Sequence, residues 1–260
     1  MSLTSRIRVA AFRRLPKHWQ PPAAYHYYRA RSLIDPELDI TRRVLRPGLR
    51  AVDVGANEGV YTHAFRGTGA FVDAFEPNPE YVATLSAYAR HHRTVRVHDV
   101  ALGARAEEAT LSVPVRDGRA VAGHGRLAAV DGAATRFPVS VRTLDSFRLA
   151  DVAVIKIDVE GHELEVLRGA RETVGRCRPL LLLEIEQRHL GGDIAEVFGE
   201  ITELGYDGSF LLPNAGARPL AEFDAAMHQR SANADRPHAL YVNNFIFRPT
   251  SGALSGYALA

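Results

Sequence analysis

Two carboxylates and an imidazole lie close together in the segment Lys156-Ile-Asp-Val-Glu-Gly-His-Glu163, between an apolar β-branched stretch and a helical pattern. Strand alternation predicts that Asp158 and Glu160 face the same side, and Gly161 permits a sharp turn that opens the helix at His162. Such side chains can take a proton from a hydroxyl group as a general base, or together bind a divalent metal, Mg²⁺ or Mn²⁺. The structural alternative makes Asp158 a helix cap and His162 a surface residue.

A further pair of acids closes the apolar segment Leu181-Leu-Leu-Glu-Ile-Glu186. Only one of Glu184 and Glu186 is expected to face the predicted site. A glutamate on such an apolar strand is costly to bury without a partner. We predict that Glu184 is the residue that faces the reacting group.

The segment Ala51-Val-Asp-Val-Gly-Ala-Asn-Glu-Gly59 places a glycine-rich turn directly before an amphipathic helix. Gly55 and Gly59 let the backbone approach a ligand, and the helix N-terminus offers unpaired N–H groups. A dinucleotide fingerprint would require glycine where this chain has Asn57 and Val60. A carboxylate at Asp53 repels a pyrophosphate and attracts an ammonium group, which suits a ligand with an amino-acid end better than NAD.

Acids also end the next two predicted strands. Glu76 closes Phe71-Val-Asp-Ala-Phe-Glu-Pro77, where its carboxylate can accept hydrogen bonds from both ribose hydroxyls of an adenosine. Asp99 follows the third strand, where it can accept from an adenine amino group while Val100 flanks the ring. Acids at three successive strand ends favour a nucleoside site more strongly than any one of them alone.

These side chains require a sheet that brings the strand ends to one edge. From Leu49 onward short apolar runs alternate with amphipathic stretches, a pattern typical of a mainly parallel sheet covered by helices. The predicted strands are at about 50–54, 71–76, 94–99, 152–158, 180–186 and 243–248, and the predicted helices at about 58–66, 78–91, 162–175 and 192–204. A half-exposed β insertion at about 109–147 precedes the fourth core strand.

The remaining parts of the chain follow a different pattern. Residues 1–48 are predicted to form a basic N-terminal cap or arm, residues 49–249 one domain, and residues 250–260 a tail. The stretch 7–15 fits a short basic amphipathic helix, which could pack on the domain or contact a membrane surface.

Charge is distributed unevenly along the chain. The net charge is +2, but residues 1–50 hold 11 basic and 3 acidic side chains and are therefore +8, which leaves −6 for the rest. Such an arm could meet anionic lipid, nucleic acid or a phosphorylated substrate, or could be a solvated flank.

Composition excludes several classes of protein. A hydrophobic share of 46% is ordinary for a globular domain, and the single Cys177 cannot form an intramolecular disulfide. No apolar stretch approaches the roughly 20 residues of a membrane span, and arginines interrupt every candidate signal peptide. We expect a cytoplasmic protein, with peripheral contact at the inner membrane surface as a further option for the arm.

Several motifs together resemble the FkbM family of S-adenosylmethionine-dependent methyltransferases. They are Val52-Asp-Val-Gly-Ala-Asn-Glu-Gly59, Phe75-Glu-Pro77, Val100-Ala-Leu-Gly103, Thr143-Leu-Asp145, Lys156 to Glu163, and Asn244-Phe-Ile-Phe247. The resemblance covers about residues 45–249 and keeps the family's order. It implies a Rossmann-like class I methyltransferase fold, an α/β sheet whose last strand is antiparallel to the rest.

The resemblance also implies the chemistry. Its residues for S-adenosylmethionine would be Asp53, Gly55, Asn57, Gly59, Glu76 and Asp99, with Asp158, Glu160 and His162 on the reaction side. The expected reaction is methylation of a hydroxyl on a sugar, polyketide or related metabolite. Two alternatives remain, namely nucleic-acid methylation, which the basic arm suggests, and cofactor binding without catalysis. The first is the runner-up, although the sequence lacks the Asn/Asp-Pro-Pro-Tyr/Phe and Pro-Cys motifs of base methylation and its basic residues are confined to one end. The intact acids on the reaction side argue against the second.

Overall fold

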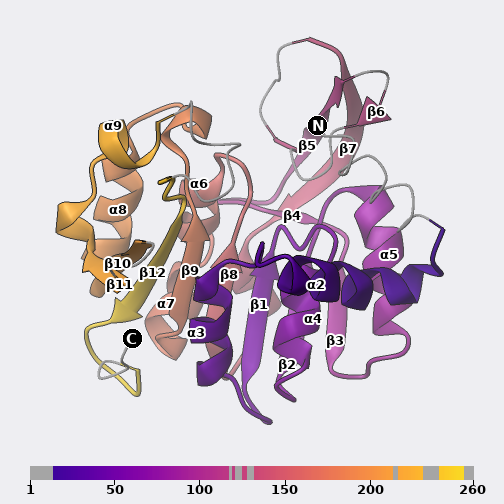
Figure 1. Cartoon of the computed structure of the whole chain (residues 1–260), viewed down its shortest axis with the longest axis horizontal. Coiled ribbons are helices and arrows are strands. Elements are labelled where there is room, and N and C mark those ends of the chain that lie inside the picture. The colour runs from indigo at the N-terminus through magenta and orange to yellow at the C-terminus, as the bar shows by residue number, and fades with distance from the viewer. Residues whose placement is uncertain are drawn as a thin grey trace.

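An eight-stranded sheet forms the centre of the protein (Figure 1). The computed structural model describes residues 14–116, 119–120, 125–127, 132–212, 216–230 and 240–254. The strand order is β11-β10-β12-β9-β8-β1-β2-β3. The bounds are β1 (Arg50–Val54), β2 (Phe71–Phe75), β3 (Val95–His98), β8 (Val152–Ile157), β9 (Leu180–Glu184), β10 (Tyr206–Leu212), β11 (Gly216–Pro219) and β12 (Asn244–Pro249).

Strand direction confirms the predicted fold class. The neighbouring strands β3, β2, β1, β8 and β9 pair in parallel. Strand β12 is antiparallel to both of its neighbours, β9 and β10. The parallel strands are buried on both faces, which explains continuous apolar runs such as Leu180 to Leu183. Their carboxyl ends all lie at one edge, where parallel α/β sheets bind ligands.

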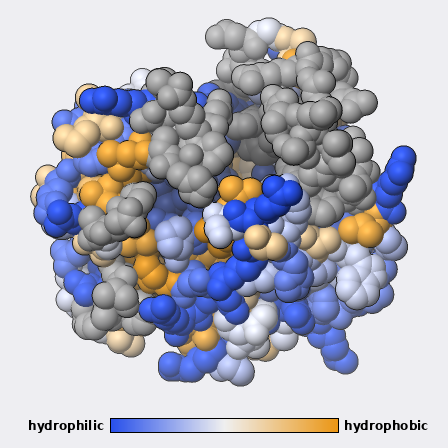
Figure 2. Space-filling model, viewed as in Figure 1, coloured by the Kyte–Doolittle hydropathy of each residue, from blue (hydrophilic) through white to orange (hydrophobic). Residues whose placement is uncertain are grey.

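Helices cover both faces of the sheet. Residues of α3 (Pro36–Val44), α4 (Val60–Arg66) and α5 (Pro79–Ala89) belong to one apolar cluster with the sheet, against which Tyr25 of α2 (Gln20–Ala30) also packs. On the opposite face α6 (Glu163–Arg168), α7 (Arg171–Cys177) and α8 (Ile194–Glu203) belong to a second cluster. Figure 2 shows a mostly hydrophilic surface below the projecting β ribbon, with apolar residues in smaller patches.

The predicted helix over 162–175 is two helices. It breaks at Gly169, where an added Cβ would lie 2.0 Å from the carbonyl oxygen of Gly103. The chain that leads into the β insertion therefore crosses the helix at this point, and only a glycine allows the contact. A hydrophobic period alone cannot reveal such a crossing.

The β insertion forms a separate small sheet with strand order β4-β7-β5-β6, as predicted for this region. Its strands are β4 (Ala101–Leu102), β5 (Glu107–Arg116), β6 (Arg119–Ala120) and β7 (Ala134–Arg142). The β5–β7 ribbon rises above the carboxyl edge of the main sheet in Figure 1. It therefore stands next to the edge at which the predicted site residues gather.

Other segments were not predicted or lie outside the described residues. Strands β10 and β11 form a hairpin, and the short helix α9 (Ala225–His228) precedes β12. The 3-10 turns are Lys17–Trp19, Leu144–Phe147, Gln187–His189 and Leu220–Glu222. Most of the predicted basic helix over 7–15 lies outside the described residues. Within the described ranges, every helix is too short or too polar to cross a membrane.

Candidate active site

The loops after β1, β2, β3 and β8 surround a first cavity at the carboxyl edge of the sheet. A second cavity of about 290 Å³ adjoins it on the side of α3 and α4. The two cavities share Gly55, Asn57 and Asp158 in their walls. Two binding spaces therefore meet at the turn after β1.

Gly55 explains how that meeting point is built. It has a φ of +75°, and an added Cβ would lie 1.8 Å from the carbonyl oxygen of Asp158. The N–H of Asp158 donates to the carbonyl of Val54 at 3.0 Å. The glycine is thus required by the neighbouring loop as much as by any ligand. Gly59, with a φ of +80°, packs against Leu85 and does not line either cavity.

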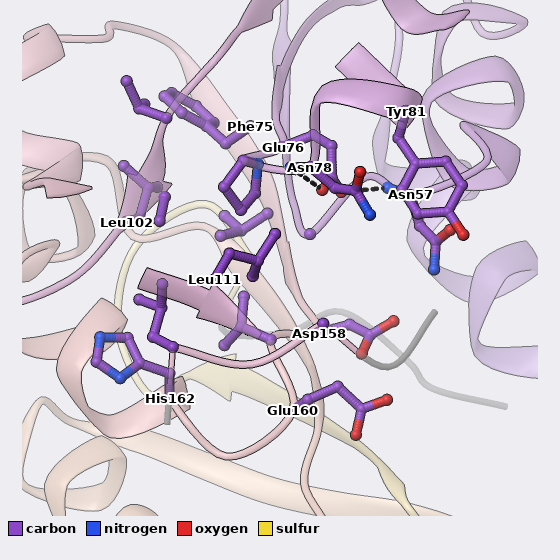
Figure 3. Close-up of a pocket in the computed structure, with 18 residues that line it drawn as sticks. Asn57, Phe75, Glu76, Asn78, Tyr81, Leu102, Leu111, Asp158, Glu160 and His162 are labelled. Carbon is purple, nitrogen blue, oxygen red and sulfur yellow. Dashed lines mark hydrogen bonds between the residues drawn. The ribbon is translucent and has the colours of Figure 1, made fainter. Parts of the chain in front are cut away.

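Glu76 lies in the wall of the first cavity, and its side chain is buried. Figure 3 shows its two carboxylate oxygens accepting the backbone N–H groups of Asn57 and Asn78, each at 2.8 Å. Burial raises the pKa of Glu76 to about 7, although both hydrogen bonds oppose that shift. Each oxygen keeps a further lone pair for a ligand hydroxyl.

The predicted group of Asp158, Glu160 and His162 is only partly assembled. Figure 3 shows the two carboxylates pointing in the same direction, whereas the His162 ring points away from them. The ring lies beside Gly103, and its burial lowers the pKa of His162. Within the described part of the chain, no three histidine, cysteine or acidic side chains are placed to hold a metal ion. The structure therefore does not support the predicted metal site.

Asp158 and Glu160 reach the same side by a route that differs from the predicted one. Strand β8 ends at Ile157, and Glu160 has a φ of +56°, so a turn rather than strand alternation aligns the carboxylates. His189, which was not predicted, lies with its Nδ1 2.7 Å from a Glu160 carboxylate oxygen. Arg126 of the β insertion approaches the same oxygen to 3.7 Å.

A charged cluster forms part of the wall of the second cavity, on the sheet face covered by α3 and α4. Lys156 is 4% exposed, and its Nζ donates to Asp158 at 2.9 Å. Asp53 pairs in register with Lys156 across β1 and β8, and Glu184 lies at the end of β9. These acids, chiefly Asp158, hold the pKa of Lys156 above its usual value despite burial. A lysine inside an apolar strand was the signal that could have identified Lys156 from sequence.

Each predicted acid of this cluster has a defined position. Asp53 is fully buried, accepts the Thr62 hydroxyl at 2.6 Å and lies below the cavity walls. Glu184 lines the second cavity and accepts from the Asn243 amide at 2.7 Å. Burial raises the pKa of both carboxyls. Glu186 accepts from Arg188 and Tyr241 outside the two cavities.

Two predicted residues after β3 have different positions. Val100 lines the first cavity, whereas Asp99 is exposed and is absent from its wall. Phe75, Leu102 and Leu111 supply further apolar surface around that cavity. The carboxylate of Glu76 on one side and apolar side chains on the other fit a ribose and a purine ring.

Asn57 provides an independent sign of a polar ligand. Its side-chain oxygen is buried and has no hydrogen-bond partner among the described residues. Leaving such an acceptor unpaired costs about 1–3 kcal/mol. An ammonium or hydroxyl donor at the junction of the two cavities would pair it, so the residues present fit the amino-acid and ribose groups of S-adenosylmethionine.

Comparison with known proteins agrees with this fold. A family model described as the methyltransferase FkbM domain matches residues 53–207. A methyltransferase FkbM from Methylobacillus flagellatus KT has a similar structure, with a TM-score of 0.50 and 18% identity, over 91% of this chain and 56% of that one. This chain therefore spans little more than half the length of that protein.

Two other solved structures are more distant. One is a precorrin-6y C5,15-methyltransferase from Geobacter metallireducens GS-15, with a TM-score of 0.42 and 12% identity over 82% of this chain and 85% of that one. Another is an rRNA methylase from Streptococcus thermophilus, with a TM-score of 0.43 and 8% identity over 81% and 91%. No curated protein matches the chain. Because the family model spans more than half of the sequence, the chain belongs to the FkbM family of methyltransferases.

Proposed function

We propose that this protein is an O-methyltransferase that uses S-adenosylmethionine to methylate a hydroxyl of a sugar, polyketide or related metabolite. The observation that carries the proposal is the position of Asp158 in the wall shared by two adjoining cavities. One cavity has the groups that fit adenosine, and the other is open for an acceptor. A carboxylate at their junction is where a hydroxyl would have to lose its proton.

The first cavity would hold the nucleoside part of the cofactor. Glu76 would accept hydrogen bonds from the ribose hydroxyls, and the apolar side chains around Val100 and Leu102 would contact the adenine. Asn57 would accept from the amino-acid end. S-adenosylmethionine, when bound, supplies a methyl group that is already activated by its sulfonium.

The remaining work of the protein is to place and deprotonate the acceptor. Positioning a hydroxyl oxygen in line with the methyl group accounts for several kcal/mol of rate enhancement. Asp158 could accept the hydroxyl proton, a contribution of roughly 10²–10⁴-fold. Lys156 donates a hydrogen bond to Asp158 at 2.9 Å and so helps to hold that side chain at the junction of the two cavities.

The charge of the second cavity supports a small-molecule acceptor over nucleic acid. The described residues of its wall include the carboxyl groups of Asp35, Glu58, Asp158 and Glu184 and one basic side chain, Lys156. A phosphate backbone entering this space would meet like charges that cost free energy in a poorly solvated cavity. The rRNA methylase likeness concerns the fold alone.

Calorimetry followed by product analysis tests the proposal. We expect heat from S-adenosylmethionine and S-adenosylhomocysteine and none from NADH. Incubation with S-adenosylmethionine and a panel of hydroxylated metabolites should give an O-methylated product by mass spectrometry and S-adenosylhomocysteine in equal amount. Methylation of RNA or DNA, with no turnover of any hydroxylated metabolite, would favour the nucleic-acid alternative. Binding without turnover of any acceptor would favour the non-catalytic one.

A further inference from the structure

A third cavity, of about 510 Å³, continues the line of binding spaces along the carboxyl edge of the sheet. It lies over β10 and the start of β12 and shares Asp35 with the second cavity of about 290 Å³. Volumes of roughly 300–1,000 Å³ are typical of small-molecule sites. An acceptor with a single ring, bound in the second cavity, would leave the larger third cavity empty.

Asp35 stands at the point where the second and third cavities meet. It occupies the N-cap position of α3, where an aspartate normally accepts a backbone N–H of its own helix. Here the side chain makes no such capping bond, and it accepts the Tyr61 hydroxyl at 3.1 Å instead. Asp35 lines both cavities, and helix capping does not explain the residue.

Glu37, two residues after Asp35, lines the third cavity. The residue is only 5% exposed, and within the described ranges its carboxyl has only its own backbone N–H as a hydrogen-bond partner. Burial, together with the nearby Asp35, raises the pKa of Glu37 to about 8. A buried carboxyl that is mainly protonated at neutral pH can both donate and accept a hydrogen bond.

The other walls of these two cavities have groups that suit hydroxyl-rich ligands. Tyr28 lies in the second cavity, and Tyr241, Asn243 and Asn244 lie in the third. Aromatic rings offer flat apolar contact with a polar edge, and amides offer both donors and acceptors. Lys156 is the single basic side chain among the described residues that line the two cavities, and it is paired with Asp158.

We propose that the acceptor is an uncharged polyhydroxy compound of at least two rings, which binds along the second and third cavities with Asp35 and Glu37 hydrogen-bonded to its hydroxyls. The ring that receives the methyl group lies in the second cavity next to Asp158, and its neighbour lies in the third. Both carboxyl residues precede the matched family domain of residues 53–207. The inference rests on the proposed O-methyltransferase function and adds the size, charge and binding residues of its acceptor.

The test uses sugars of matched size and charge as probes. Methyl glycosides of glucose, galactose, mannose and rhamnose are compared with neutral disaccharides of the same sugars and with the corresponding uronosides. Release of S-adenosylhomocysteine gives kcat and KM for each. We expect kcat/KM to be about tenfold or more higher for the best disaccharide than for its single ring, as one or two added hydrogen bonds predict. We expect no turnover of uronosides.

Three variants then locate the binding. Asp35→Asn and Glu37→Gln preserve shape, and each should raise KM for the disaccharide about tenfold while leaving affinity for S-adenosylhomocysteine within about twofold. Glu37→Gln should leave KM for the single ring nearly unchanged. The control is Asp39→Asn on the same helix, because Asp39 pairs with Arg29 at 2.8 Å on the surface and lines neither cavity.

Each other outcome overturns the inference. A uronoside as the best substrate would refute the charge argument, and equal turnover of one and two rings would refute the third cavity as a subsite. If Asp35→Asn and Glu37→Gln have the same KM for the disaccharide as Asp39→Asn, neither carboxyl binds the acceptor. Loss of S-adenosylhomocysteine affinity in Asp35→Asn would assign the second cavity to the cofactor. No turnover of any panel member by protein that binds S-adenosylmethionine would refute the acceptor class, whereas failure to bind S-adenosylmethionine would refute the proposed function itself.

Discussion

The ionisation of Glu76 should control how cofactor affinity depends on pH. Burial raises the pKa of this carboxyl to about 7. The ionised form can accept two ribose hydroxyls while it keeps the backbone N–H groups of Asn57 and Asn78. The protonated form uses one position for its own hydrogen and so loses an acceptor. Affinity for S-adenosylhomocysteine should therefore rise as pH rises through 7.

The size of the effect follows from the pKa. With a pKa of about 7, roughly a tenth of the Glu76 carboxyl is ionised at pH 6 and about nine tenths at pH 8. If the ionised form carries tight binding, Kd falls about tenfold over that range, which is about 1.4 kcal/mol. Glu76→Gln cannot titrate, so its Kd should be flat. At pH 8 the variant should bind about 1–3 kcal/mol more weakly because charge-assisted hydrogen bonds are lost.

Titration calorimetry with S-adenosylhomocysteine at pH 6, 7 and 8 measures these values without turnover. The matched control is Glu163→Gln. Glu163 is also buried with its pKa raised to about 7, and it accepts the Gly161 N–H at 2.9 Å. It lines none of the three cavities. The control should therefore keep the tenfold dependence of the wild type.

Three results would refute this reasoning. A Kd that is constant from pH 6 to 8 in the wild type would show that Glu76 does not accept the ribose in its ionised form. A dependence that persists in Glu76→Gln would assign it to another group. Loss of the pH dependence in Glu163→Gln would show that a buried carboxyl outside the cavities, and not Glu76, sets the affinity for S-adenosylhomocysteine.

Three further predictions concern the reaction side and the turn. Asp158→Asn should lower kcat at least about tenfold with little change in S-adenosylhomocysteine affinity, because a transition-state interaction is lost. If kcat is unchanged in both Asp158→Asn and Glu160→Gln, Glu184 becomes the better candidate for the reaction side. Turnover should persist in EDTA, because His162 is turned away from the two carboxylates; loss restored by Mg²⁺ or Mn²⁺ would contradict this. Gly55→Ala should lower the melting temperature strongly, since its Cβ would lie 1.8 Å from the Asp158 carbonyl oxygen, whereas Gly175→Ala, in open space on a helix, should raise it slightly. Equal melting temperatures would show that the turn relaxes.

Local patterns were sufficient to predict the parallel strands of the sheet and the first turn. Apolar runs bounded by turn residues located β1, β2, β8 and β9 within one or two residues at most ends, because a strand buried on both faces leaves a continuous signal. The acid at the end of β2 could also be predicted to face a ligand, since its position depends only on where the strand ends. Glu76 lies in the first cavity for that reason.

Contacts between distant segments were not predictable in the same way. His162 was expected beside Asp158, but the ring fits next to Gly103, which belongs to the start of the β insertion. Asp99 was expected to contact adenine, yet the chain leaves it exposed after β3. Lys156 was part of the quoted motif without a role, because two of the three acids around it, Asp53 and Glu184, come from neighbouring strands. Each of these positions depends on packing that no short stretch of sequence encodes.

The two cavities that we assign to the acceptor take part of their lining from outside the family domain. The matched region of residues 53–207 contains the first cavity, whereas Tyr28 and Asp35 precede it and Tyr241 and Asn244 follow it. These flanking segments meet because α3 packs on the sheet beside β9 and because β12 returns to the middle of the sheet. In the proposed arrangement, acceptor choice therefore depends partly on segments that take no part in cofactor binding. Substitutions at Asp35 or Glu37 should change which acceptor is methylated without changing how the cofactor binds.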